Sequence, residues 1–339
     1  MAPYKALELK GPSPASGELR AQFLGVTTIL FDDGKTSIMT DGFFSRPPAL
    51  QMALGKIGPD HALIDDALDR SGVTKPGASK LDALLVAHSH FDHALDSGRV
   101  AKLTGARLVG TASTGEIGLA ESVPDDRIEL VCDGKTFDFG AFAITAIQSP
   151  HSPNAKFPGV IEKPFHPPTH VSNYKEGGKE EEGGGNYSFL IRHGGISMLF
   201  HPSANVVPER FQGVQADVVF LGIGTLGLQS TAFAERYWNA VVRDTGARLV
   251  IPIHWDAFNL PLHEPLQPMP KPFDDFDNAM TMILVPANRD GVAVRFMPTF
   301  EIIGIEGALR QLPARRVDTR PRTVETRTKR ASCDDGPKR

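Results

Sequence analysis

The stretch "LLVAHSHFDHALD", residues 84–96, runs from apolar residues directly into three histidines and two aspartates. The preceding segment 81–87, "LDALLVA", is short, apolar and followed by polar residues, which is typical of a strand in a protein core. Its end is the place where ionisable side chains accumulate. We therefore treat His88, His90, Asp92 and His93 as candidate functional residues.

The spacing of these four residues is that of metal ligands. On an extended segment His88 and His90 lie on one side, and a helix beginning near Asp92 turns Asp92 and His93 inward. Imidazole and carboxylate suit zinc, with manganese or iron as substitutes, and an open zinc position lowers the pKa of water to about 7. The alternative is a polar loop with surface histidines. Three histidines and one aspartate within residues 88–93 favour a metal.

The rest of the chain alternates strand-like and helix-like segments. We predict a hairpin over 22–41, strands over 106–111, 216–224 and 247–254, three short strands within 127–149, a hairpin over 186–200, and helices over 59–73, 95–105 and 232–246. This order predicts an α/β layered sandwich, in which two β-rich sheets pack on one another with helices outside. With 339 residues, 41% of them hydrophobic, the chain can bury a large core.

Composition divides the chain into three parts. We expect an N-terminal extension over 1–19, one domain over 20–305, and a disordered basic tail over 306–339. Within the domain, residues 152–185 are crowded with proline, glycine and charge, which predicts a long loop. We expect this loop to act as a lid over the candidate site.

The charge balance and the cysteines restrict the partners. The net charge of −4 indicates neither nucleic acid nor an anionic membrane as a partner, so we expect a small-molecule substrate, with a homodimer left open. No apolar run approaches the roughly 18 residues that span a bilayer, and the first residues lack a signal-peptide pattern. We expect a cytoplasmic protein, or a periplasmic one if a signal peptide has been removed. Two cysteines cannot form a thiolate cluster, so histidines and carboxylates must hold any metal.

The motif "HSHFDH", residues 88–93, resembles the HxHxDH signature of the metallo-β-lactamase superfamily, a set of zinc hydrolases and relatives. Other family motifs follow in order over about residues 20–300. "TDG" resembles the early motif whose aspartate, here Asp41, supports the site; "SPHSP" supplies His151 and "IPIHW" supplies His254. The resemblance implies an αββα sandwich of two mixed β-sheets with helices on the outer faces.

The resemblance also implies two metal sites. His88, His90 and His151 would form the first site, and Asp92, His93 and His254 would form the second. Asp92 would be the catalytic residue, since it would both bind metal and orient the attacking hydroxide.

One family position differs in this chain. The family usually places a metal-bridging aspartate where this sequence reads "HPSAN", and Ser203 stands there, with His201 and Asn205 beside it. A hydroxyl is a poorer bridging ligand than a carboxylate, so we expect one tightly bound zinc and a weaker second site. A single site at Asp92, His93 and His254, completed by Asn205, is the alternative, and so is a simple turn at "SAN". Trp255, directly after His254, is a candidate substrate contact.

The implied activity is metal-dependent hydrolysis of a small ester, lactone, lactam or phosphodiester. A hydrolytic dehalogenase of a chlorinated aromatic, similar to chlorothalonil dehalogenase, is the alternative within that class. Diiron members of the superfamily that reduce oxygen or nitric oxide generally need a flavin domain, for which this chain has no room. A metal-binding protein with an altered, inactive site is the alternative from another class.

Overall fold

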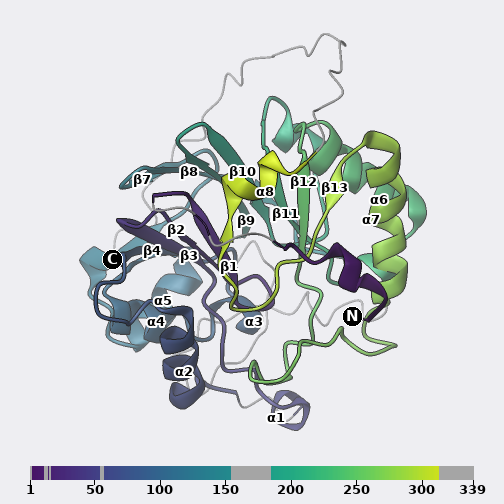
Figure 1. Ribbon diagram of the computed structural model, residues 1–339. Helices are drawn as coiled ribbons and strands as arrows, with labels where there is room; N and C mark the ends of the chain where they lie inside the picture. Colours follow the sequence, from purple (N-terminus) through teal and green to yellow (C-terminus); the bar gives the residue numbers. More distant parts are fainter. Residues whose placement is uncertain (1, 11–13, 15–16, 54–56, 154–184, 313–339) are drawn as a thin grey trace.

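Two β-sheets pack face to face with helices outside them (Figure 1). The computed structural model describes residues 2–10, 14, 17–53, 57–153 and 185–312. Most of the expected lid and most of the expected tail lie outside these residues. The αββα architecture implied by the resemblance is confirmed.

The first sheet has seven strands in the order β14-β1-β2-β3-β4-β5-β6. Its strands are β1 (Arg20–Phe23), β2 (Ile29–Asp32), β3 (Thr36–Thr40), β4 (Lys80–Leu85), β5 (Arg107–Gly110), β6 (Ile128–Leu130) and β14 (Ile303–Gly304). The pairs from β14 to β3 are antiparallel and those from β3 to β6 are parallel, so the sheet is mixed.

The second sheet repeats this arrangement in the order β13-β12-β11-β10-β9-β8-β7. Its strands are β7 (Thr136–Phe139), β8 (Phe142–Ser149), β9 (Asn186–His193), β10 (Ile196–His201), β11 (Val218–Gly222), β12 (Leu249–Ile253) and β13 (Ala293–Val294). Strands β7 to β10 are antiparallel neighbours, and β10 to β13 are parallel neighbours.

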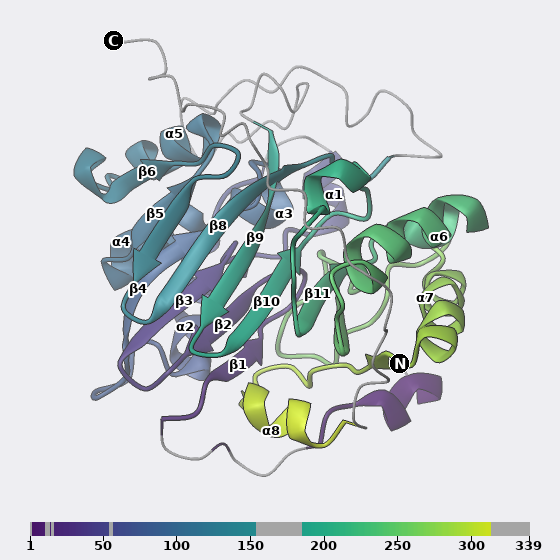
Figure 2. The same ribbon diagram turned by 90° about the horizontal axis from the view of Figure 1, so that it is seen from above.

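The main helices lie outside the sheets, α4 and α5 beside the first and α6 and α7 beside the second (Figures 1 and 2). The α-helices are α1 (Ala49–Ala53), α2 (His61–Ser71), α3 (Phe91–Ala94), α4 (Ser97–Thr104), α5 (Ala112–Ala120), α6 (Thr231–Trp238), α7 (Phe276–Asp290) and α8 (Ile305–Arg310). Short 3-10 helices are η1 (Ala2–Leu7), η2 (Asp125–Arg127), η4 (Pro208–Phe211) and η5 (Leu226–Leu228), and a π-helical turn, η6 (Asn239–Arg243), continues α6.

Helix α2 shows how the sequence defines its elements. The Asp60 side chain accepts hydrogen bonds from the N–H groups of Ala62 and Leu63 in the first turn, and Gly72 ends the helix in the left-handed conformation, at φ 86°. Between these caps, Ile64, Leu68 and two small residues face the core. The helix predicted over 59–73 is confirmed.

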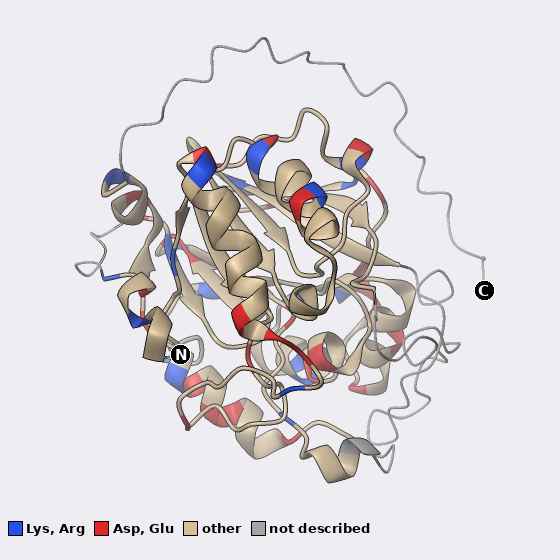
Figure 3. Cartoon of the chain, turned by 90° about the vertical axis from the view of Figure 1, so that its right-hand side faces the viewer, with Lys and Arg blue, Asp and Glu red and all other residues tan. Residues whose placement is uncertain are grey.

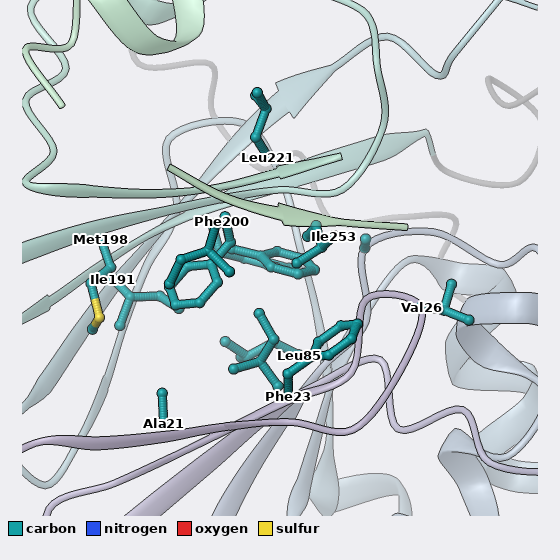
Figure 4. Close-up of a cluster of buried hydrophobic side chains, with 14 of the residues drawn as sticks. Ala21, Phe23, Val26, Leu85, Ile191, Met198, Phe200, Leu221 and Ile253 are labelled. Carbon is teal, nitrogen blue, oxygen red and sulfur yellow. The ribbon is translucent and has the colours of Figure 1, made fainter. Parts of the chain in front are cut away.

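Apolar side chains of both sheets fill the space between them. Phe23 and Leu85 of the first sheet face Phe200 of the second, and all are buried (Figure 4). Every residue of β11 is buried, as expected for a strand covered on both faces. Acidic and basic residues are interspersed on the outer helices of the side shown in Figure 3.

The structure differs from the sequence prediction in one strand that matters for the site. The segment predicted as the first arm of the hairpin, 22–31, is divided into β1 and β2 by a turn over residues 24–28. Gly25 and Val26 have positive φ values of 99° and 48°, which a strand cannot accommodate. The β-branched residues of "GVTTIL" suggested a continuous strand, whereas tertiary contacts impose the turn.

The chain ends of the predicted domain also contain regular structure. Helix α8 occupies the first residues of the expected tail, and Ile305, Ala308 and Leu309 are buried. The folded part therefore continues beyond residue 305. At the other end, Tyr4 of η1 packs edge-on against Phe276, with ring centroids 5.3 Å apart. Among the described residues, no helix is both long enough and apolar enough to cross a membrane.

Candidate metal centre

The candidate ligands lie directly after the ends of three strands. His88, His90, Asp92 and His93 follow β4, and the last two lie in the single turn of α3. His151 follows β8, and His254 follows β12. The predicted turn at Asp92 is present, because the backbone N–H groups of His93 and Ala94 donate to the carbonyl of His90.

The structure brings the six residues together as two groups of three. His88, His90 and His151 form one group, and Asp92, His93 and His254 form the other. Within each group the ligand atoms lie within 4.8 Å of one another. The two groups adjoin, because the ring centroids of His88 and His93 are 4.0 Å apart. We call them the three-histidine group and the Asp92 group.

Asp41 holds the His93 ring through its Nδ1 atom. Asp41 Oδ2 lies 2.8 Å from His93 Nδ1 and accepts a hydrogen bond from Thr27 Oγ1 at 2.5 Å, while Oδ1 accepts from the Ala87 N–H at 2.8 Å. A carboxylate at Nδ1 holds the proton there and leaves Nε2 as the ligand atom. Asp41 thus lies where the sequence predicted a supporting residue. Thr27 was not predicted, because nothing in "VTTIL" distinguishes it from a strand residue.

His254 completes the Asp92 group from the second sheet. Its Nε2 lies 3.2 Å from Asp92 Oδ2 and 3.2 Å from His93 Nε2. Its backbone has a φ of 57°, and its N–H donates to the carbonyl of Val26 at 2.6 Å. A side chain at Gly224 would begin 2.8 Å from His254 Nδ1, so only glycine fits beside this ring.

The three-histidine group fits a divalent metal ion. His88 is only 2% exposed, and neither of its ring nitrogens has a hydrogen-bond partner among the described residues. A buried imidazole without partners is costly, and a metal ion would satisfy it. Burial lowers the pKa of His90 to about 4, and burial together with neighbouring imidazoles holds the pKa of His88 and of His151 well below its usual range. These rings are therefore neutral at pH 7, as ligands must be.

Asp92 is the charged member of the constellation. Burial alone would raise its pKa, but the neighbouring His93 and His254 outweigh this effect and hold the pKa well below its usual range. Asp92 is therefore a carboxylate at neutral pH. It supplies a hard oxygen donor beside two nitrogen donors, a set that suits zinc, manganese or iron.

The "HPSAN" segment supports the His151 loop. Asn205 Nδ2 donates to the carbonyl of His151 at 2.6 Å, and the Ala204 N–H donates to Ser152 Oγ at 2.6 Å. Ser203 Oγ donates to Asn186 Oδ1 at 3.3 Å. Each of these contacts fixes the backbone or the side chains around the candidate ligand His151.

His201 is occupied by contacts of its own. Its Nδ1 lies 2.6 Å from Ser188 Oγ, and its Nε2 lies 2.9 Å from the carbonyl oxygen of Asn205. Both ring nitrogens are thus engaged within the core of the second sheet, where burial lowers the pKa to about 4. The structure gives His201 a supporting position below the "HPSAN" turn.

The aromatic residues near the site differ in their surroundings. Trp255 is 5% exposed and packs against Phe23, Phe276 and Phe296, so little of its ring is left to contact a substrate. Phe91, inside the histidine motif, is partly exposed and packs edge-on against Phe258 with ring centroids 5.6 Å apart. Phe91 is thus better placed than Trp255 to contact an apolar substrate group.

Comparison with known proteins agrees with this geometry. Residues 20–254 match the model of the beta-lactamase superfamily domain. A metal-dependent hydrolase of Anaeromyxobacter dehalogenans is 29% identical over 213 residues, which cover 58% of this chain and 68% of that protein. A metal-dependent hydrolase of Staphylococcus aureus is 22% identical over 282 residues, covering 82% of this chain and 100% of that protein.

Solved structures share the fold at low sequence identity. A protein of Veillonella parvula described as a possible metal-dependent hydrolase superposes with a TM-score of 0.51 at 14% identity, covering 85% of this chain and 100% of that chain. The diiron β-hydroxylase CmlA of Streptomyces venezuelae superposes with a TM-score of 0.52 at 15% identity, covering 86% of this chain and 55% of that chain.

Proposed function

Because this chain belongs to the metallo-β-lactamase superfamily, we propose that it is a metal-dependent hydrolase, with zinc as its preferred metal. The observation that carries the proposal is the pair of adjoining ligand groups, each with three donor atoms within 4.8 Å. The relatives from Anaeromyxobacter dehalogenans and Staphylococcus aureus are both described as metal-dependent hydrolases, which supports the same activity.

The chain itself can prepare a hydrolytic site. A divalent ion held by these residues would supply Lewis acidity and would lower the pKa of a water molecule to near neutrality. Asp92, ionised at pH 7, can accept a hydrogen bond from the attacking water and orient it. Asp41 keeps His93 in the tautomer that leaves Nε2 available, and the partly exposed Phe91 offers an apolar surface beside Asp92.

The proposed substrate is a small molecule with an electrophilic carbon or phosphorus. Esters, lactones, lactams and phosphodiesters all meet this description, and a chlorinated aromatic would meet it in a hydrolytic dehalogenase. In each case the developing negative charge would lie next to the ligand groups, where a cation stabilises it.

Two measurements on the purified protein test the proposal. Elemental analysis gives the metal and its stoichiometry, and assays with a nitrophenyl ester, a bis-nitrophenyl phosphate, a chromogenic lactam and a chlorinated nitrile give the reaction class. We expect zinc and turnover of at least one substrate, both lost on chelation and restored by zinc. His61→Ala, at an exposed position of α2, is the control for general effects of histidine removal. A protein that binds metal but hydrolyses none of the four would favour the altered metal-binding alternative.

A further inference from the structure

His254 and two other residues have backbone conformations that cost free energy. Val26, Arg46 and His254 itself have φ values of 48°, 47° and 57°. The left-handed region is unfavourable for residues other than glycine, and most of all for a β-branched residue such as valine. Strained residues of this kind persist only where surrounding contacts enforce them, and they are frequent at functional sites.

A buried ion pair connects these three residues. Arg46 Nη1 donates to Asp256 Oδ2 at 2.8 Å and to the carbonyl of Ala257 at 3.0 Å. Asp256 Oδ1 accepts a hydrogen bond from the Val26 N–H at 2.8 Å, and the Val26 carbonyl accepts from the His254 N–H at 2.6 Å. The chain of contacts therefore leads from Arg46 to the backbone of a candidate ligand.

The segment that carries Arg46 is tied at its other end to the helical ligands. Asp96 follows α3, which carries Asp92 and His93. Its carboxylate accepts hydrogen bonds from the N–H groups of Phe44 and Ser45 at 2.6 and 2.7 Å, and from Ser45 Oγ at 2.5 Å. Residues 44–46 thus connect the helical side of the Asp92 group with the His254 side. We call this segment the strap.

Stability alone is a weak explanation for this ion pair. Both side chains of the Arg46–Asp256 pair are 0% exposed, and the desolvation of such a pair can cancel its attraction. In addition, Arg46 Nε and Nη2 are buried without hydrogen-bond partners among the described residues, which adds a further cost. A costly pair that bridges strained residues beside a ligand is better explained by geometric control of that ligand.

We propose that Arg46 and Asp256 are positioning residues that set the metal affinity of the Asp92 group. The inference rests on the proposed metal-dependent function. The pair holds the His254 backbone at the distance from α3 at which His254 Nε2 meets Asp92 and His93. In the three-histidine group, Ser152 and Asn205 hold the His151 loop, and both lie outside the strap, so we expect the Arg46–Asp256 pair to leave the affinity of that group unchanged.

The test compares the two ligand groups in separate backgrounds. His151→Ala leaves the Asp92 group complete, and His254→Ala leaves the three-histidine group complete. Arg46→Met is introduced into each, and the dissociation constant of Zn²⁺ is measured by competition with a chromogenic chelator. We expect about 10- to 100-fold weaker binding in the His151→Ala background, as for other residues that orient ligands, and unchanged binding in the His254→Ala background.

Two further variants separate positioning from simple damage to the fold. Arg46→Met combined with Asp256→Asn removes the pair without leaving a buried charge, and Arg46→Lys keeps the charge but not the planar guanidinium. We expect the double variant to fold and to show the same selective loss, and Arg46→Lys to recover part of the affinity. Arg20→Met, in the Arg20–Asp32 pair at the far end of the β1–β2 hairpin, is the matched control.

Equal weakening in both backgrounds would show a general structural role and would overturn the inference. Unchanged affinity in both would overturn it as well, while leaving the proposed function intact. If the unmodified protein bound no Zn²⁺, the proposed function and this inference would fail together.

Discussion

Replacing Asp41 by asparagine is the most direct test of how the fold prepares a ligand. Asp41 is 0% exposed and has a φ of 54°, a conformation that asparagine tolerates better than most residues. The Ala87 N–H donates to Oδ1, so the amide oxygen of the substituted side chain would be retained at that position. The amide NH₂ group would then face His93 Nδ1 and Thr27 Oγ1 in place of Oδ2.

The consequence of Asp41→Asn is a change of tautomer. An amide N–H at 2.8 Å from His93 Nδ1 favours the ring form that carries its proton on Nε2, and that form cannot bind a metal through Nε2. Rotating the amide instead would leave the Ala87 N–H facing a donor, which costs about 1–3 kcal/mol. We expect a loss of about 10- to 100-fold in zinc affinity and kcat/KM, equivalent to about 1.4–2.7 kcal/mol.

Zinc affinity is measured by chelator competition, and kcat/KM with whichever chromogenic substrate the protein turns over. Asp33→Asn is the matched control, since Asp33 Oδ2 contacts His193 Nε2 at 3.0 Å in a similar pair outside the ligand groups. If Asp41→Asn retained both zinc affinity and turnover, Asp41 would have no role in preparing His93.

Three other outcomes are expected. His88→Ala, Asp92→Ala and His93→Ala should each reduce metal content or turnover. The loss should exceed the roughly 10- to 100-fold that follows the removal of a residue that only orients a ligand. Full retention in all three variants would show that the ligands are assigned wrongly. After dialysis the unmodified protein should retain about one zinc ion per chain. Ser203→Asp should raise the number of bound zinc ions toward two, because a bridging carboxylate offsets the repulsion between two cations. Two tightly held ions in the unmodified protein would contradict this reasoning. The metal-free protein should lose stability as the pH falls from about 6.5 toward 4. Burial lowers the pKa of His201 to about 4 and that of His88 well below its usual range, so both rings stay neutral in the folded protein at pH values where they take up protons in the unfolded chain. Proton uptake by the unfolded chain therefore lowers the free energy of unfolding as the pH falls below about 6.5. Thermal unfolding is measured across this range in the presence of chelator, and a flat profile would mean that these rings are not protonated on unfolding.

Local spacing was sufficient for much of the site. The histidine motif follows a buried strand, and the predicted turn places His93 beside His88 and groups Asp92 with His93. His151 and His254 could be proposed only through the family resemblance, since each is a single histidine after a strand. The structure brings both to the motif, whereas metal binding by the six residues stays a prediction.

The supporting residues could not be predicted from the sequence, because their contacts join distant segments. Val26 and Asp256 are 230 residues apart, and Arg46 and Asp256 are 210 apart. No periodicity connects such positions, and the turn at Val26 contradicts its local β propensity. Trp255 illustrates the opposite case, since its place next to His254 in the sequence suggested a substrate contact, whereas its ring packs into the core.

The two ligand groups differ in charge, and this difference predicts which of them holds the tight zinc. The Asp92 group contains one carboxylate and has Asp41 behind His93, whereas the three-histidine group consists of neutral rings supported by neutral side chains. A buried divalent cation is attracted by nearby negative charge more strongly than by neutral donors, because screening is weak there. The three-histidine group has no carboxylate of its own, and Asp92 acts on it only from the neighbouring group. We therefore expect His151→Ala to retain one tightly bound zinc ion after dialysis and His254→Ala to lose the tightly bound ion. The reverse pattern in elemental analysis would mean that the nitrogen donors, and not the charge, decide which group binds zinc more tightly.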